Sequence, residues 1–344
     1  MQQWRLFPYL AAYYVMKVFG DNLYRDYVRF IANSYDSAAD RLELAMAGAQ
    51  IHALSCAGKS LAGWLARDAI QECREACGGH GYLRAAGIGH LRDDNDANCT
   101  YEGDNNVLLQ QTSNWLLSIW ANPKQGKKAS PLPSSVAFLE DIENIASKTF
   151  RPKKLQELMQ PEVILDAYKW LLCWLLQSTS EKYKSEVEHG KDDFAARNDS
   201  QVFFARTLSL VYVEHYVIGQ FAIFCSKPGL EPQIAAALRN LLLLFGLWSL
   251  EKHLGSLYQG GYASGPLPSS LIREGILALC RSLKGDAVAL VDAIAPPDFI
   301  LNSCLGNSDG EVYKHLRLAM SECPNGLERP GWWRDITRRL QAKL

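Results

Sequence analysis

The chain has 344 residues, which allows about two domains and a large buried core. Its 36 lysines and arginines balance 37 aspartates and glutamates, so it lacks the positive field that attracts a phosphate backbone, and no nucleic-acid partner is expected. Nine scattered cysteines and no apolar leader argue against a secreted disulfide framework and favour a reducing compartment. The longest apolar stretch, Leu241 to Leu250, is about half the roughly 20 residues that cross a bilayer, so no membrane span is expected.

The apolar residues at the start of the chain have helical spacing. Phe7, Leu10 and Tyr14 fall on one face of a helix that Gly20-Asp21-Asn22 is expected to weaken or end. A second, long helix is predicted between Ser37 and Cys77, because small or apolar residues recur there every three or four positions. These residues are Leu42, Met46, Ala49, Ala53, Cys56, Ser60 and Gly63.

The helical period disappears between Gly78 and Gly103, which predicts a long connection of the kind that is often functional. Its acidic run, Asp93, Asp94 and Asp96, is interpreted as a solvated loop. A helix is expected to begin near Asp104, a good N-capping residue type. Three lysines and three prolines at 122–135 indicate a linker, and we place a domain boundary there, between 1–121 and 136–344.

The chain beyond the linker contains further helical segments and no sustained apolar–polar alternation typical of a half-buried strand. The predicted segments are Leu155–Leu158, Val163–Ser178, Gln201–Cys225, Ile234–Tyr258, Ser270–Ala295 and Tyr313–Ser321. The sequence therefore predicts an all-α fold.

Two polar segments could carry chemistry. In the first, Gly78, Gly79 and Gly81 would let backbone N–H groups approach another molecule, and amides near helix ends suit an anionic group such as a pyrophosphate. The same glycines are also explained as a simple helix stop. In the second, Glu102 stands at the entrance to a helix. It could act as a general base, or it could be an acidic residue favoured by the helix dipole.

Together the two segments resemble the C-terminal half of the acyl-CoA dehydrogenase and oxidase superfamily. The similarity is carried by CREACGGHGYL (73–83) and CTYEGDNNVLLQQ (99–111). The motifs CGGHGY and TYEGDN look like those of the peroxisomal acyl-CoA oxidases. The length of the segment that follows Glu102, roughly 240 residues, also looks like theirs. MQQWRLFPYLAA at the start and LKGDAVALVDAIAPPDFILNS near the end look most like the branched-chain (pristanoyl-CoA) type.

This resemblance implies an FAD-dependent oxidase that converts an acyl-CoA to a trans-2-enoyl-CoA and reduces O2 to hydrogen peroxide. Glu102 would be the catalytic base, and Tyr101, Glu102 and Gly103 would contact the substrate. Gly78, Gly79 and Gly81 would contact FAD, as would Asp104 and Asn106. It also implies a partial dehydrogenase-type helical bundle followed by a second helical domain, and a homodimer in which the glycine turn of one subunit lies against the FAD of the other.

One position departs from the family pattern. The dehydrogenases have a glutamine three residues before the first glycine, whereas this chain has Glu75, which places that FAD contact in doubt. The last three residues, Ala342-Lys343-Leu344, are a close variant of the Ser-Lys-Leu address read by the peroxisomal import receptor, so a peroxisomal location is expected.

The resemblance also implies that the chain begins partway through the bundle, so a truncated form is expected. Two readings stay open beside the oxidase: a non-catalytic helical module that pairs with other subunits, and a dehydrogenase. No metal site is expected, because Cys73 and Cys77 lack a second ligand pair at zinc-like spacing.

Overall fold

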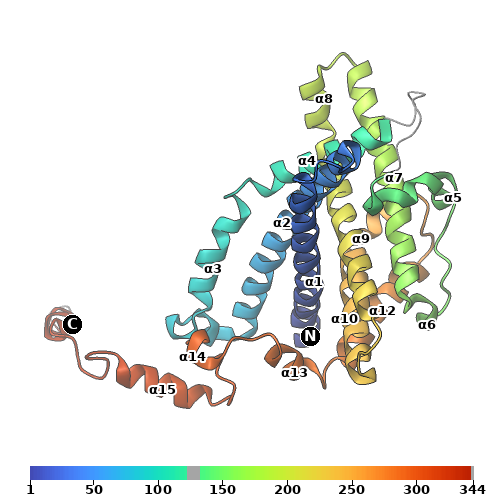
Figure 1. Ribbon diagram of the computed structural model, residues 1–344. Helices are drawn as coiled ribbons and strands as arrows, with labels where there is room; N and C mark the ends of the chain where they lie inside the picture. The colour runs from blue at the N-terminus through green and yellow to red at the C-terminus, as the bar shows by residue number, and fades with distance from the viewer. Residues whose placement is uncertain (122–131, 342–344) are drawn as a thin grey trace.

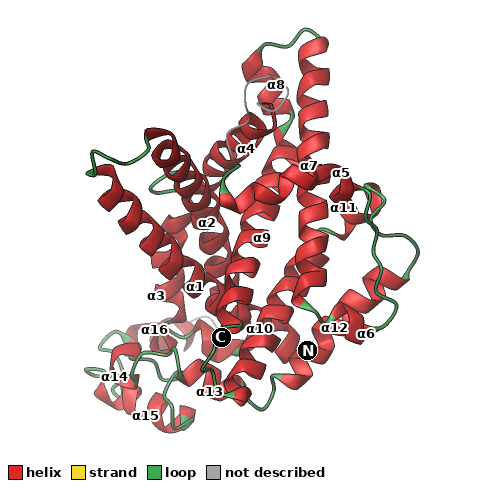
Figure 2. Ribbon diagram, turned by 45° about the vertical axis from the view of Figure 1, so that its right-hand side comes forward, coloured by secondary structure: helices red, strands yellow, loops and turns green. Residues whose placement is uncertain are grey.

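The computed structural model describes residues 1–121 and 132–341, and within these residues every regular element is helical. The all-α prediction is therefore confirmed (Figure 2). The elements before residue 122 are α1 (Gln2–Ser34), α2 (Arg41–Ala76), η1 (Gly78–Tyr82), η2 (Arg84–Ala86), α3 (Ile88–Asp96), η3 (Ala97–Cys99) and α4 (Asn105–Ala121).

The helices after residue 131 include the long helices α7, α9 and α10, with shorter helices around them. The elements are η5 (Ser134–Asp141), α5 (Ile142–Ala146), α6 (Leu155–Leu158), α7 (Pro161–Glu188), α8 (Asp193–Asp199), η6 (Gln201–Ala205), α9 (Arg206–Cys225), α10 (Pro232–Glu251), α11 (Leu254–Gln259), α12 (Leu267–Ser282), α13 (Ala287–Asp292), α14 (Asp298–Leu301), α15 (Val312–Glu322) and α16 (Trp333–Gln341).

The helix α1 lies at the centre of the molecule, with α2 on one side and α9 and α10 on the other (Figure 1). It approaches α2 closely because Gly58 has no side chain: a Cβ there would lie 2.5 Å from the Phe19 ring. This is the close packing that the small residues of the second helix predicted.

One hydrophobic core joins the two parts of the chain. Leu54 and Leu109 come from the first part, and Leu171, Phe221 and Leu244 from the second, and all five are at most 1% exposed. Residues 122–131 of the expected linker lie outside the described residues. Ser135, at its end, is buried and its hydroxyl lies 2.8 Å from that of Tyr212 on α9.

Gly20-Asp21-Asn22 was expected to weaken or end the first helix, and the helix does not end there, because α1 continues to Ser34. A glycine inside a helix costs about 1 kcal/mol. Here the cost is outweighed because apolar residues on both sides of it, Phe19 and Leu23, pack on the core.

The expected irregular connection at 78–103 is also wrong, since most of it is helical. The acidic run lies on α3 rather than in a loop. The helix α3 runs beside α2 but contains no buried residue, so its sequence has no apolar stripe to reveal it.

Two helical segments, Gln201–Cys225 and Pro232–Glu251, are long and apolar enough to cross a membrane by length and composition. About half of each is buried within the protein, and α9 and α10 pack against α1 and α7. Their apolar character is therefore accounted for by the core.

The segment that contains α13 to α16 lies at the end of the bundle away from α8, and α15 extends sideways from the bundle in Figure 1 (Figures 1 and 2). It is tied to the first part of the chain, because Tyr14 donates a hydrogen bond to the carbonyl of Leu290 at 2.8 Å. The Ser303 hydroxyl and the Cys304 amide donate to the carbonyls of Ala86 and Ala85, at 2.6 and 3.0 Å. The C-terminal segment therefore holds the chain that follows the glycine turn.

Candidate functional site

Glu102 occupies a sharp turn immediately before α4. Its φ is +54° and that of Gly103 is +106°, so two successive residues have left-handed or related backbone conformations. A residue other than glycine in this region costs about 1–2 kcal/mol. The turn leaves the Glu102 side chain exposed. Its backbone N–H has no hydrogen-bond acceptor among residues 1–121 and 132–341.

The beginning of α4 is fixed by Asp104 and Asn105. One carboxylate oxygen of Asp104 accepts hydrogen bonds from the amides of Asn106 at 2.9 Å and Val107 at 3.4 Å. This confirms the predicted helix start. Asn105 is 1% exposed, and its carbonyl accepts a hydrogen bond from the Ser60 hydroxyl on α2 at 2.9 Å.

Lys59, also on α2, reaches the same turn. Its ammonium donates to the carbonyl of Gly103 at 2.7 Å and to Oδ1 of Asn105 at 2.8 Å. The amide nitrogen of Asn105 is buried and has no hydrogen-bond partner among the described residues. Lys59 is thus a cation that engages Gly103 and Asn105, the first and third residues after Glu102.

The other predicted residues around Glu102 are held by their neighbours. The Tyr101 hydroxyl donates to Oδ1 of Asn98 at 2.6 Å. Oδ1 of Asn106 lies 3.4 Å from Nε of Arg206, whose guanidinium stacks over the ring of Trp64, 4.9 Å from its centroid. The structure therefore brings Tyr101, Glu102, Gly103, Asp104 and Asn106 together at one end of α4.

The glycine turn lies at the C-terminal end of α2, where the glycines have different local roles. Gly78 has φ +59°, which favours glycine, whereas a Cβ at Gly79 would meet nothing within 4 Å. Gly81 is buried, and a Cβ there would lie 2.2 Å from the carbonyl oxygen of Arg74. Gly79 therefore leaves space for another molecule, while Gly81 is needed by the protein's own backbone. This open face fits the predicted contact with a large cofactor.

A groove of about 450 Å3 lies beside the glycine turn. The cations Arg74 and Arg92 line it together with Gly81 and Tyr82, and two carboxylates of α3 complete it, those of Asp93 and Asp96. Neither guanidinium makes a hydrogen bond or ion pair within the described part of the chain. These guanidinium groups could pair with an anionic group at this end of α2.

The two predicted parts of the site are not adjacent within one chain. Lys59, beside the Glu102 turn, and Ala76, before the glycine turn, are 17 residues apart on α2. At 1.5 Å per residue this separates them by roughly 25 Å. A single cofactor molecule could touch either the Glu102 turn or the glycine turn of a given chain. The other turn would be free to contact a cofactor bound at another site.

Glu75, the departure from the family pattern, is engaged by other side chains. Its carboxylate lies 3.6 Å from Arg5 on α1 and accepts a hydrogen bond from Nε2 of Gln71. Arg5 also pairs with Glu72 at 2.8 Å. The carboxylate is therefore partly neutralised by Arg5, and the neighbouring Gln71 still offers an amide, whose buried oxygen has no partner among the described residues.

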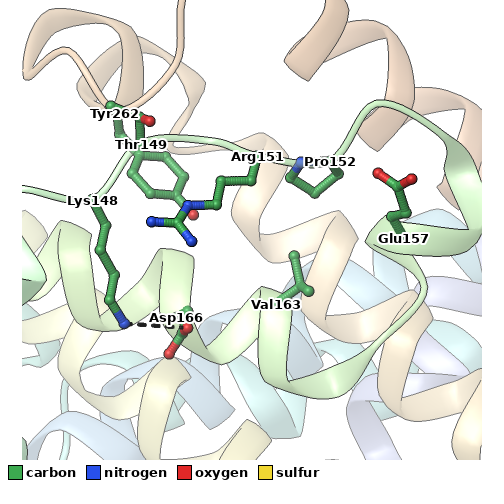
Figure 3. Close-up of a pocket in the computed structure, with 8 residues that line it drawn as sticks. All are labelled: Lys148, Thr149, Arg151, Pro152, Glu157, Val163, Asp166 and Tyr262. Carbon is green, nitrogen blue, oxygen red and sulfur yellow. Dashed lines mark hydrogen bonds and ion pairs between the residues drawn. The ribbon is translucent and has the colours of Figure 1, made fainter.

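A separate cavity of about 230 Å3 lies on the other part of the chain, beside α6 and α7 (Figure 3). The guanidinium of Arg151 and the ring of Tyr262 lie above Asp166, and Asp166 pairs with Lys148 at 3.4 Å (Figure 3). None of the residues predicted for the site lines this cavity. Among the described residues, no group of three or more histidine, cysteine, aspartate or glutamate side chains could hold a metal ion.

Sequence reasoning missed Lys59 and Arg206, because their roles depend on contacts between elements far apart in the chain. Lys59 lies 44 residues before Gly103, and Arg206 lies 100 residues after Asn106. Lys59 could have been noticed because it is a lysine within a stretch of α2 that otherwise consists of small, close-packed residues. No local signal marked Arg206.

Comparisons with known proteins agree with the geometry. The family described as "Acyl-CoA oxidase" matches residues 160–342, and the "Acyl-CoA oxidase, C-alpha1 domain" matches residues 1–117. The chain is 47% identical to peroxisomal acyl-coenzyme A oxidase 3 of Homo sapiens over 98% of its length and 48% of that protein. It thus spans about half the length of this relative.

Solved structures share the fold. The acyl-CoA oxidase 1 of Arabidopsis thaliana superimposes with a TM-score of 0.87 at 28% identity, over 100% of this chain and 50% of the other. Acyl-CoA oxidase-1 of Caenorhabditis elegans, described as complexed with FAD and ATP, superimposes with a TM-score of 0.85 at 24% identity, over 100% of this chain and 50% of the other.

Proposed function

We propose that this chain, which belongs to the acyl-CoA oxidase family, carries the catalytic base and the flavin-contacting turn of an FAD-dependent acyl-CoA oxidase. The substrate is a 2-methyl-branched acyl-CoA, and the products are the trans-2-enoyl-CoA and hydrogen peroxide. The observation that carries this proposal is the Glu102 turn, in which a strained backbone presents an exposed carboxylate and a free N–H at the start of α4.

Glu102 removes the α-proton of the thioester. This proton is too weakly acidic for a carboxylate in water, so negative charge that develops on the thioester oxygen must be stabilised. The backbone N–H of Glu102 has no acceptor within the described residues and is available for this oxygen. The N-terminus of α4 adds the positive end of its dipole.

FAD would supply the acceptor for the β-hydrogen as hydride and would pass the electrons to O2. Gly78 and Gly79 of this chain would contact, through their backbone, an FAD bound beside Glu102 of a second copy, whereas Asp104 and Asn106 would contact the FAD beside Glu102 of their own chain. The open face of Gly79 supports the first assignment. The relative from C. elegans that is described as complexed with FAD supports the presence of a flavin in the family.

The oxidase works as a homodimer in this proposal. The roughly 25 Å between Lys59 and the end of α2 separates the Glu102 turn from the glycine turn. A second copy would supply its glycine turn to the flavin beside Glu102, so each site would use two chains.

The protein acts in the peroxisome. The relative from Homo sapiens is named a peroxisomal enzyme. Ala342-Lys343-Leu344 would be read by the peroxisomal import receptor, although these residues lie outside the described part of the chain. An oxidase is favoured over a dehydrogenase because residues 160–342, in the second helical part, match the acyl-CoA oxidase family.

The visible absorption spectrum of the purified chain tests the proposal, followed by a peroxide assay with a 2-methyl-branched acyl-CoA. A flavin spectrum with peroxide formation is the expected result. A folded, helical and colourless protein without peroxide formation would instead favour a non-catalytic module that pairs with other subunits, an alternative favoured by the chain's half-length match to its relatives.

Replacement of the base provides a second test on flavin-loaded protein that contains the whole site. Glu102→Gln preserves shape but cannot accept the α-proton, so we expect peroxide formation to fall by about 10²-fold or more while the flavin spectrum is retained. The control is Glu43→Gln on α2, an exposed carboxylate in the first turn of that helix. Activity of Glu102→Gln near that of the unmodified protein would remove Glu102 from the role of base.

A further inference from the structure

Lys59 is the side chain that joins α2 to the turn after Glu102. Its ammonium donates to the carbonyl of Gly103 at 2.7 Å and to Oδ1 of Asn105 at 2.8 Å, and the adjacent Ser60 donates to the carbonyl of Asn105. Lys59 and Ser60, consecutive residues of α2, thus both bind Asn105 at the start of α4, and Lys59 also binds the turn before it.

The turn needs such a partner. Glu102 has φ +54° without being glycine, and such a conformation persists only where the surrounding contacts enforce it. Asp104 fixes the amides of Asn106 and Val107, which lie on the helix side of the turn. Among the described residues, Lys59 is the side chain that binds the Gly103 carbonyl, next to Glu102 itself.

We propose that Lys59 is a positioning residue for Glu102: by holding the Gly103 carbonyl, its ammonium keeps the Glu102 backbone in the left-handed conformation that aims the carboxylate and the free N–H at the substrate. The inference rests on the proposed role of Glu102. It assigns Lys59 no contact with substrate or flavin.

The main difficulty of a test is that Lys59 also satisfies a buried group. Lys59→Met keeps the apolar stem of the side chain but leaves Oδ1 of Asn105 without a donor, and Asn105 is 1% exposed. A loss of stability would follow whether or not Lys59 positions Glu102. The double variant Lys59→Met/Asn105→Leu replaces both partners by apolar groups of similar size, which removes the unpaired buried amide while leaving the Gly103 carbonyl free.

The experiment compares the unmodified chain, Lys59→Met, the double variant and Lys59→Arg. Thermal unfolding measures stability, and backbone NMR of the whole chain measures the Cα and Cβ shifts of Glu102, which report its backbone conformation. We expect Lys59→Met to lower the melting temperature and to shift the Glu102 signals. The double variant should recover the melting temperature but keep the shifted Glu102 signals, and Lys59→Arg should restore them at least in part.

Glu102 signals that stay unchanged in Lys59→Met, or that recover together with the melting temperature in the double variant, would overturn the inference. Such a result would leave Lys59 with a structural role only. The NMR readout needs no flavin and no turnover, so it decides the role of Lys59 even if the proposed oxidase activity fails.

In flavin-loaded protein that turns over acyl-CoA, a second readout follows. A displaced base lowers the rate of proton abstraction more than it weakens substrate binding, so the double variant should lower kcat by about 10- to 100-fold with little change in KM. If Glu102→Gln is inactive but the double variant has a normal kcat, the proposed role of Lys59 is refuted and that of Glu102 is retained. A fully active Glu102→Gln protein would instead refute the proposed base.

Discussion

His215 on α9 places a titratable ring in the protein interior. Its Nδ1 is buried without a hydrogen-bond partner among the described residues, and its ring packs edge-on against Phe138, 5.0 Å between centroids. Burial, with a smaller contribution from the positive charge of Lys169, lowers the pKa of His215 from 6.5 to about 3. The folded protein therefore keeps this ring neutral at pH values where the unfolded chain protonates it.

The stability of the protein should consequently fall as the pH decreases from 6.5 towards 3. The unfolded chain binds a proton in this window that the folded chain does not, so the free energy of unfolding should be about 2 kcal/mol lower at pH 5 than at pH 7 through this group. Denaturant unfolding at both pH values measures the difference.

His215→Gln should remove most of that difference, whereas replacement of the exposed His189 by glutamine should leave it intact. Paired carboxylates contribute at lower pH: for example, hydrogen bonds from Lys182 and Lys191 lower the pKa of Glu186 to about 2. An unchanged pH dependence in His215→Gln would show that other groups cause it.

At the scale of elements, α2 ends in a turn whose glycines differ in what they tolerate. A Cβ at Gly81 would lie 2.2 Å from the backbone carbonyl of Arg74, which cannot move without disturbing the last turn of α2, whereas a Cβ at Gly79 would meet nothing within 4 Å. We expect Gly81→Ala to lower the free energy of unfolding by about 1–3 kcal/mol, and Gly79→Ala to change it little. Denaturant unfolding of the two variants measures this difference.

Gly79→Ala also tests the cofactor assignment without the complication of misfolding. A loss of flavin affinity in this well-folded variant would indicate that another molecule approaches Gly79 closely. Equal stability losses in both variants would contradict the structural distinction between the two glycines.

The long helices that the sequence predicted have a buried face, whereas α15, predicted as Tyr313–Ser321, buries no residue. The helices α2, α4 and α7 bury apolar residues at helical spacing, and their periodicity is visible in the sequence. The periodicity did not reveal α3, which buries no residue, and it joined η6 to α9 across a break where Val202 and Phe203 leave the helical conformation. Burial produces the strongest sequence signal, and neither the exposed helix α3 nor the break at Val202 and Phe203 left one.

The candidate site shows the same limit. Tyr101-Glu102-Gly103 and the glycine turn were found because they are contiguous segments. The strain at Glu102 and its connection to Lys59 are properties of the folded backbone. No pattern of residue types encodes a positive φ at a glutamate.

At the scale of the whole molecule, the shared core couples the two parts of the chain. The Ser209 hydroxyl on α9 donates to the carbonyl of Leu109 on α4 at 2.7 Å, and Thr112 on α4 donates to the carbonyl of Ala53 on α2 at 2.9 Å. Both hydrogen bonds are buried. The first connects the parts, and the second lies within the N-terminal part.

We therefore expect the chain to unfold in a single calorimetric transition. Ser209→Ala and Thr112→Val should each lower that one transition by about 1–2 °C, since a buried hydrogen bond contributes about 1 kcal/mol and the chain is long. Two transitions, with Thr112→Val shifting only one of them, would instead show that the parts on either side of 122–135 unfold independently.

The length of α2 between Lys59 and Ala76 sets the distance between the Glu102 turn and the glycine turn. One residue inserted there would advance the glycine turn by about 1.5 Å and rotate it by about 100° about the helix axis relative to Glu102. A substitution in the same stretch leaves both quantities unchanged. Side chains in this stretch can therefore be exchanged, but residues cannot be inserted or deleted. The number of residues sets the direction in which the glycine turn faces a second molecule.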